Sequence, residues 1–421
     1  MPAISPTAFN PNYLDELSLT TALAEGSHAA VLQAFFGLNA YQELSHLAHL
    51  ATSMPKDRYA PNVYLLPGLL GSKLGLIHDN RTDLIWFEPA AVISGRLSAL
   101  TFGTNPLIRP LGVMLPPYLK LALTLQAAGM NVKLYPYDWR CSIIDTGQRL
   151  ATDIAQDPSD QIQIVAHSMG GLVARAAMNH PAFNKVSRLI QLGTPNLGSF
   201  ALLQTLRACY PTVRKLATLD RHHSAEELTQ RIFSSFPSFY EMLPSHQHTQ
   251  DINLFDKQCW PQDALTPSAE YLHAGQKIIP LLANADQRCH TIVGTSQKTV
   301  TGLYRSSDEF IFQISHQGDG TVPIDLAKWK NSQHWFVSEN HGQLPRSTVV
   351  CQAVVDLLHT AQTQRLKAQF QPSNNSYSVH SEAELRPLAN KKIHWDRLSL
   401  NERRDLLEPV ISEAFIAACT L

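Results

Sequence analysis

Short apolar runs alternate with helix-like segments over much of this chain of 421 residues. The runs are rich in β-branched residues, as buried strands are; they read VYLLPG, NVKLYPY, IQIVAH, VSRLIQLGTP and CHTIVG. Segments with helical composition, such as YLKLALTLQAAG and LVARAAMNH, lie between them. This alternation predicts the α/β class, a mostly parallel sheet flanked by helices.

The pattern divides the chain into three regions. Residues 1–58 are rich in Ala and Leu and end at a breaker, which predicts a helical N-terminal extension. Residues 59–360 carry the alternation, and residues 361–421 are charged and predict a helical C-terminal tail. Within the second region, the stretch of about 199–289 has large apolar residues without strand–helix alternation. We expect it to form a cap, or lid, over the carboxyl edge of the sheet.

Composition narrows the classes of function. Hydrophobic residues make up 44% and charged residues 16%, as in a globular protein, and the length suffices for one large core with an insertion or for two domains. The formal net charge of −1 gives no basic patch for nucleic acid, so we expect no nucleic-acid partner. Contact with a lipid surface, where it occurs, would be transient.

The cysteines and the N-terminal residues indicate in which cellular compartment the protein is expected. The six cysteines are scattered and form no CxxC pair, as in a reducing compartment, although Cys259 and Cys289 could pair in an exported chain. No basic start followed by an apolar stretch is visible, and no uncharged apolar run is long enough to span a bilayer. We therefore expect a cytoplasmic protein.

The strand-to-helix junction IQIVAHSMGGLVARAAM places Ser168 at a tight turn. Ala166 and Gly170 stand two residues before and after it, where the strand and helix backbones nearly touch. This small-x-Ser-x-Gly pattern predicts a nucleophile elbow that lifts the hydroxyl beside the helix N-terminus. The alternative is a Gly-Gly pair before a helix that hosts a serine by chance.

A nucleophilic serine needs a base and an orienting carboxylate, which follow it as acid and then histidine in the doubly wound hydrolases. Asp319 lies in a Gly-Asp-Gly turn after the strand-like FIFQIS, where sites of open α/β sheets are built. The alternative is a turn whose aspartate binds only its own backbone.

His341 is the predicted base. It follows the strand-like HWFV, stands beside Gly342 in a polar loop, and precedes the helix-like STVVCQAVVDLL. The competitors are His316, close to Asp319 in sequence, and His334 and His290, which adjoin strands without a glycine opening.

Two backbone amides would hold an oxyanion. The amide of Met169 follows the nucleophile, and the amide of Leu69 follows the turn Pro67-Gly68 after the first strand. An ordinary strand-ending Pro-Gly turn is the alternative for the second.

These segments together resemble the lecithin:cholesterol acyltransferase-like family of lipases and acyltransferases, over about residues 60–350. The resemblance rests on LPGLLGSKL, YPYDWR, AHSMGG, LGTPNLGS, FPSFYEMLP, GDGTVP and the late HG, in this order. It implies an α/β-hydrolase fold with Ser168, Asp319 and His341 as catalytic residues, Leu69 and Met169 as oxyanion donors, a mobile cap and ester-lipid substrates. Ala166 in place of the first elbow glycine, and the lack of paired lid cysteines, depart from secreted members. These departures bear on lipoprotein and bilayer substrates rather than on the three residues.

The function expected from the sequence is acyl transfer through a covalent serine ester. The substrate would be an ester lipid or another acyl ester, with water or an alcohol as acceptor, and neither a metal nor an organic cofactor is expected. Asp138 and Arg140 in YPYDWR would form a buried structural ion pair. Two alternatives stay open: a non-catalytic binding or scaffolding protein on a hydrolase fold, and an interaction role for the helical ends. The sequence leaves the oligomeric state open.

Overall fold

The computed structural model describes residues 9–55, 60–78, 81–250, 252–306, 308–371, 376–386, 393–399 and 402–406. Its central sheet has six parallel strands in the order β11-β8-β7-β6-β1-β5. Their bounds are β1 Asn62–Leu66, β5 Asn131–Leu134, β6 Ile162–His167, β7 Val186–Leu192, β8 Cys289–Gly294 and β11 Gln333–Val337. The predicted α/β class is confirmed.

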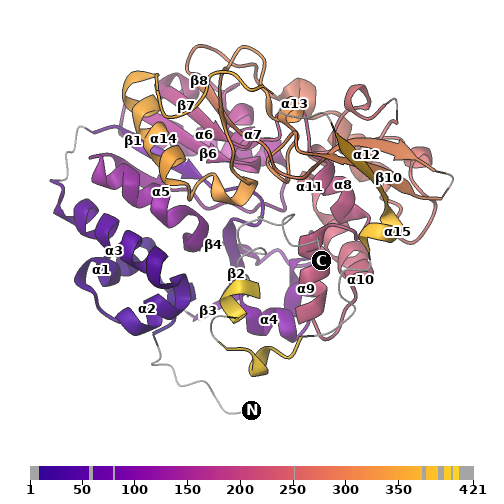
Figure 1. Cartoon of the computed structure of the whole chain (residues 1–421), viewed down its shortest axis with the longest axis horizontal. Helices are drawn as coiled ribbons and strands as arrows, with labels where there is room; N and C mark the ends of the chain where they lie inside the picture. Colours follow the sequence, from indigo (N-terminus) through magenta and orange to yellow (C-terminus); the bar gives the residue numbers. More distant parts are fainter. Residues whose placement is uncertain are drawn as a thin grey trace.

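Helices cover both faces of this sheet because its strands are apolar on both sides. In β1, Val63 and Leu65 pack with α5 (Leu115–Ala127) and α14 (Thr348–Thr360), whereas Tyr64 and Leu66 face the opposite cluster. That cluster holds α6 (Ile143–Gln156) and α7 (Met169–Ala177). Figure 1 shows the resulting layers.

The strand order reverses at β1. The strand β1 pairs with β5 on one side and with β6 on the other, and β7, β8 and β11 continue outward from β6. Ligands of open α/β sheets bind at the carboxyl ends of the strands at such a switch point. The loops that follow β1 and β6 therefore define the place to look for a site.

The predicted cap region is helical. It contains α8 Phe200–Leu206, α9 Pro211–Leu219, α10 Ala225–Arg231, α11 Pro237–Glu241 and α12 Ala269–Gln276. Its described residues contain no strand before β8, which begins at Cys289. Three aromatic side chains, Phe233, Phe236 and Phe239, pack against one another inside it. Figure 1 shows α8, α9 and α10 grouped to one side of the central sheet.

Two small antiparallel sheets flank the core. One is formed by β2 Ser72–His78, β3 Arg81–Trp86 and β4 Arg109–Val113, and the other by β9 Thr299–Arg305, β10 Phe310–Ser315 and β12 Tyr377–Ser381. The strand that precedes Asp319 is β10, which belongs to the second of these small sheets. The sequence predicts a strand of the parallel sheet at this position, and that prediction is wrong. Asp319 still reaches the carboxyl edge of that sheet, since a Cβ on Gly294, the last residue of β8, would lie 2.6 Å from the Asp319 Cβ.

The described part of residues 1–58 contains the helices α1 Glu16–Glu25, α2 Ala29–Phe36 and α3 Leu38–Ser53. These helices share a core with Leu115, Leu119 and Leu123 of α5, and Figure 1 shows them beside that helix. No described helix has both the length and the apolar character needed to cross a bilayer.

The C-terminal segment contains a strand among its described residues, and most of the stretch on which the predicted helical tail rests, including residues 407–421, lies outside the described residues. The segment adds strand β12 to β10 in antiparallel pairing and continues into α15 (Glu382–Leu385), whose Glu382 is buried against the cap residue Arg207. Glu382, a charged residue of this segment, thus takes part in a buried ion pair. The remaining short elements are α4 Pro89–Ile93, α13 Ile324–Ala327 and the 3₁₀ helices η1 Pro11–Tyr13, η2 Arg96–Leu100, η3 Pro181–Lys185, η4 Phe233–Ser235, η5 His246–His248, η6 Lys257–Cys259, η7 Ile279–Leu281, η8 His341–Gln343 and η9 Trp395–Arg397.

Candidate active site

Ser168 lies between the end of β6 and the start of α7, with φ 52° and ψ −126°. A positive φ at a residue with a side chain is strained and persists only where its surroundings enforce it. A Cβ on Gly170 would lie 2.5 Å from the Pro67 carbonyl oxygen, and one on Gly171 would collide with Thr194. The turn therefore requires small residues after the serine, as the elbow pattern predicts.

Asp319 and His341 form a buried pair. The Nδ1 atom of His341 lies 2.7 Å from Oδ2 of Asp319, and both side chains are at most 1% exposed. The other carboxylate oxygen, Oδ1, accepts hydrogen bonds from the amides of Thr321 and Val322 at 2.9 and 2.6 Å. The backbone thus fixes the carboxylate, which holds the proton of His341 on Nδ1 and leaves Nε2 as the ring atom that can accept a proton.

The loops that carry Ser168 and His341 meet through His167. The His167 and His341 ring centroids are 4.8 Å apart, and Nε2 of His167 lies 3.1 Å from the carbonyl oxygen of His341. The Ser168 amide donates to the carbonyl of Leu192, and a Cβ on the next residue, Gly193, would lie 3.0 Å from the Asp319–His341 pair. The residues next to Ser168 thus adjoin the Asp319–His341 pair.

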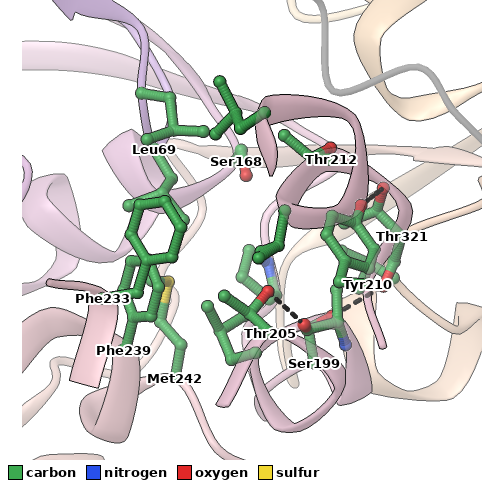
Figure 2. A pocket seen from close by; sticks show the side chains of 17 residues that line it. Leu69, Ser168, Ser199, Thr205, Tyr210, Thr212, Phe233, Phe239, Met242 and Thr321 are labelled. Carbon is green, nitrogen blue, oxygen red and sulfur yellow. Dashed lines mark hydrogen bonds between the residues drawn. The ribbon is translucent and has the colours of Figure 1, made fainter. Parts of the chain in front are cut away.

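The loop after β1 lies against the elbow. A Cβ on Gly68 would approach the Cβ of Ser168 to 2.8 Å, which leaves room for glycine alone. Leu69 lies next to Ser168 at the cavity (Figure 2), and Met169 is the first residue of α7. Among the described residues, neither the Leu69 amide nor the Met169 amide donates a hydrogen bond within the protein.

Three aromatic side chains hold this loop, and sequence reasoning missed them. Tyr118 accepts from the Gly68 amide at 2.8 Å, Tyr137 donates to the Pro67 carbonyl at 2.7 Å, and Trp86 donates to the Leu70 carbonyl at 2.8 Å. Of the three, only Tyr137 could have been singled out from the sequence, because it lies in the motif YPYDWR. In the same motif the Arg140 guanidinium forms two hydrogen bonds with the carboxylate of Asp138, and both residues are buried, as expected of a structural pair.

An apolar cavity opens beside Ser168. It encloses about 610 Å³, part of it open to solvent. Figure 2 shows Phe233, Phe239 and Met242 along one wall and Thr205 and Tyr210 along the other. The lining combines the loop after β1, the elbow, the cap and the loop after Asp319; it consists of Leu69, Leu70, Ser168, Pro195, Ser199, Ala201, Leu202, Thr205, Tyr210, Thr212, Val213, Leu216, Phe233, Phe239, Met242, Thr321 and Val322.

Among the aromatic residues of the cap, Phe239 lines the cavity and Trp260 does not. Trp260 is fully buried elsewhere: its ring packs edge-on against Phe310, with centroids 5.5 Å apart, and its Nε1 donates to the carbonyl of Leu254. The composition of the insertion predicted that its large apolar residues, Phe239 and Trp260 among them, would lie over Ser168. Phe239 lines the cavity beside Ser168, but Trp260 is not part of its lining.

Among the described residues, Asp319 bonds to His341 and to none of the competing histidines. His316 is exposed, and the amide of Trp329 donates to Nε2 of His334. The side chain of His290 is buried beside Trp335, and burial lowers its pKa to about 4. Cys259 and Cys289 are both free thiols. Within the described ranges, no three His, Cys, Asp or Glu side chains gather in a way that would hold a metal ion.

A parallel sheet covered by helices, with a strained serine at the switch point, defines an α/β-hydrolase fold. The sequence model named "Lecithin:cholesterol acyltransferase" matches residues 120–387, well over half of the chain. The chain therefore belongs to the lecithin:cholesterol acyltransferase family, as its motifs suggested.

Solved structures similar to this chain include the lipase BlEst2 of Bacillus licheniformis. Its propeptide form has 15% identity and a TM-score of 0.35, over 69% of this chain and 48% of that one. The mature form has 14% identity and a TM-score of 0.33, over 69% and 87%. The Tle4–Tli4 complex has 13% identity and a TM-score of 0.48, over 73% and 100%. This chain thus spans about half the length of the first, and no curated protein sequence matches it.

Proposed function

We propose that this chain is a serine acyl hydrolase or O-acyltransferase that acts on ester lipids through a covalent acyl-enzyme. Ser168 is the nucleophile, His341 the base and Asp319 the residue that orients the base. The amides of Leu69 and Met169 hold the oxyanion. The observation that carries the proposal is the strained Ser168, which lines an apolar cavity beside the buried Asp319–His341 pair.

The chemistry follows from the hydrogen-bonding capacities of these groups. Because Asp319 accepts the Nδ1 proton of His341, Nε2 can take the proton of Ser168 as its oxygen attacks the ester carbonyl. The carbonyl oxygen becomes negatively charged, and the two amides stabilise it. Collapse of the tetrahedral species expels the alcohol, which receives the proton from His341. Water or a second alcohol then releases the acyl group by the same steps in reverse.

The cavity supports the choice of substrate. Its lining is mostly hydrocarbon, from Leu69, Leu202, Leu216, Phe233 and Phe239 among others. Apolar cavities of this kind bury hydrocarbon ligands and leave orientation to a few polar groups. A fatty acyl chain fits this lining, whereas a charged or strongly hydrated substrate would lose its hydration without replacement.

The division of the chain remains a prediction: residues 59–360 as the hydrolase domain with the cap at about 199–289, and residues 1–58 and 361–421 as extensions. The packing of α1–α3 on α5 and the pairing of β12 with β10 tie both extensions to residues 59–360. Activity should therefore be measured on the full chain.

The test is labelling with a fluorophosphonate, which forms a covalent bond with activated serines. Wild-type protein should be labelled and should hydrolyse lipid esters. The Ser168→Ala variant should lose both, with a fall in turnover on the order of a millionfold and an unchanged circular dichroism spectrum. A panel of lipid esters with and without alcohols then separates hydrolysis from transfer. If wild-type protein is neither labelled nor active, the alternative of a binding or scaffolding protein on a hydrolase fold holds instead.

A further inference from the structure

A chain of three hydrogen bonds joins the oxyanion loop to the loop of His341. The amide of Gly68 lies 2.8 Å from the hydroxyl oxygen of Tyr118, and that oxygen lies 3.0 Å from Nδ1 of His167. Nε2 of His167 lies 3.1 Å from the carbonyl oxygen of His341. Both side chains in the middle of the chain, Tyr118 on α5 and His167 at the end of β6, are at most 3% exposed.

The direction of every bond in this chain is fixed. The carbonyl of His341 can only accept, so Nε2 of His167 carries the proton and Nδ1 has a lone pair. The Tyr118 hydroxyl must then donate to Nδ1, and its oxygen accepts from the Gly68 amide. The imidazole has to stay neutral for this order, and burial lowers the pKa of His167 well below its ordinary value.

On the basis of the proposed function, we propose that Tyr118 and His167 are positioning residues that couple the oxyanion loop to the base. The Tyr118 hydroxyl holds the Gly68 amide, which fixes the orientation of the next peptide and so of the Leu69 amide beside Ser168. His167, the neighbour of the nucleophile, holds the backbone of His341. One polar chain thus sets the distance between the oxyanion donor and the general base, on which the transition state depends.

The packing around Tyr118 supports a close fit. A Cβ on Gly71 would lie 2.8 Å from the Tyr118 hydroxyl oxygen, so the loop folds around this atom. The Tyr118 and His167 rings also meet edge to face, with centroids 5.8 Å apart. Removal of the hydroxyl alone would keep the ring contact and leave the Gly68 amide without its acceptor.

The experiment compares Tyr118→Phe, His167→Leu and their combination with Tyr64→Phe as the matched control. Tyr64 is also a buried tyrosine, and its hydroxyl donates to Asp157 at 2.6 Å, remote from the elbow. Steady-state kinetics on a soluble nitrophenyl ester and thermal unfolding are measured for each full-length variant. Tyr118→Phe should lower kcat about 10- to 100-fold with KM nearly unchanged, because complete loss of an oxyanion donor costs about 100- to 1000-fold. Tyr64→Phe should lower Tm but leave kcat within about twofold of wild type.

Two further results distinguish positioning from general stabilisation. The combined variant should be no slower than the slower single variant, because both changes break one chain of bonds; independent structural effects would multiply instead. His167→Gln should recover most of the activity that His167→Leu loses, since the amide offers one acceptor and one donor. This comparison also carries the test if Tyr118→Phe fails to fold.

The inference is overturned if Tyr118→Phe keeps the kcat of wild type, if the effects of the two single variants multiply, or if His167→Gln is as slow as His167→Leu. These outcomes require an active wild-type enzyme, so they differ from failure of the proposed function. If the proposed function is wrong, the wild-type protein itself shows neither labelling nor turnover.

Discussion

Tyrosine hydroxyls form hydrogen bonds near both ends of strand β1, but they bind different kinds of group at each end. Toward the amino edge of the sheet, Tyr64 donates to the carboxylate of Asp157, which also accepts from Asn62 and Lys133 at 2.8 and 2.5 Å. At the carboxyl edge, Tyr118 and Tyr137 bind the backbone of the loop at Pro67 and Gly68. The first set neutralises one buried charge, whereas the second holds main chain in place.

The difference shows where stability and function lie in this fold. Around Asp157 the donors converge on a single carboxylate and no strained backbone is involved, so the arrangement is that of a stabilising network. Around Ser168 the backbone is strained and polar groups adjoin an apolar cavity. Strain of this kind is kept where surrounding bonds enforce it, commonly at functional sites. Changes at the carboxyl edge should therefore affect turnover, and changes at the amino edge should affect unfolding.

His341→Ala should have the largest effect on turnover. Its loss removes the only proposed base, and we expect a fall on the order of a millionfold, similar to that of Ser168→Ala, because the three residues act as a unit. The measurement is kcat on a soluble ester, with Tm as a check on folding. His334→Ala is the matched control, since Nε2 of His334 accepts from the amide of Trp329 and not from a group of the proposed site; if His334→Ala is inactive and His341→Ala is active, the base is misassigned.

Asp319→Asn should be less damaging, on the order of ten-thousandfold in kcat. The asparagine oxygen can keep the bonds from the amides of Thr321 and Val322, which turns its NH2 group toward Nδ1 of His341. The proton of the imidazole then moves to Nε2, and the ring cannot accept the serine proton. Asp325→Asn, on the exposed side of α13, should leave kcat unchanged. If Asp319→Asn keeps its activity, Asp319 only stabilises the backbone of its own turn and does not orient His341.

The elbow and the fold class could be predicted from the sequence because local rules govern them. The apolar period marked the strands, and the small residues around Ser168 are required by contacts that the turn itself creates, such as that of Gly170 with Pro67. The three segments with Ser168, Asp319 and His341 could be ordered along the chain because the hydrolase fold fixes that order.

What the sequence could not predict depends on contacts between distant segments. Tyr118 lies in an apolar helix that is buried between the central sheet and the N-terminal helices, and only the tertiary structure places its hydroxyl at Gly68, 50 residues away. Likewise, nothing in the residues 377–381 themselves fixes the pairing with β10 that makes them a strand. The separate roles of Phe239 and Trp260 also arise from packing rather than from pattern.

Phe239→Ala should alter substrate preference more than turnover. Phe239 is 2% exposed and lines the cavity beside the cap. If the ring contacts about two methylenes of a long acyl chain, at roughly 0.8 kcal/mol each, its loss lowers kcat/KM on dodecanoyl esters about tenfold relative to acetyl esters. Trp260→Phe is the control, since Trp260 is buried outside the cavity and should lower Tm without changing this ratio. Equal losses on both esters for Phe239→Ala would mean that the ring supports the cap only.

Asp157→Asn should have the smallest effect on catalysis and should act on stability alone. Burial by itself would raise the pKa of Asp157, but hydrogen bonds from Lys133, Tyr64, Ser159 and Asn62 outweigh it and lower the pKa to about 2. A carboxyl whose pKa is lower in the folded state stabilises that state above its unfolded pKa, near 3.8, and this contribution disappears as the pH falls through about 2.

The free energy of unfolding, measured with urea, should therefore be lower in Asp157→Asn than in wild type by about 1–3 kcal/mol at neutral pH. The difference should shrink as the pH is lowered below about 4, while kcat at neutral pH stays that of wild type. A variant with lower kcat and unchanged stability would contradict the division of β1 into a stabilising end and a functional end, because it would link the amino edge of the sheet to the chemistry at Ser168.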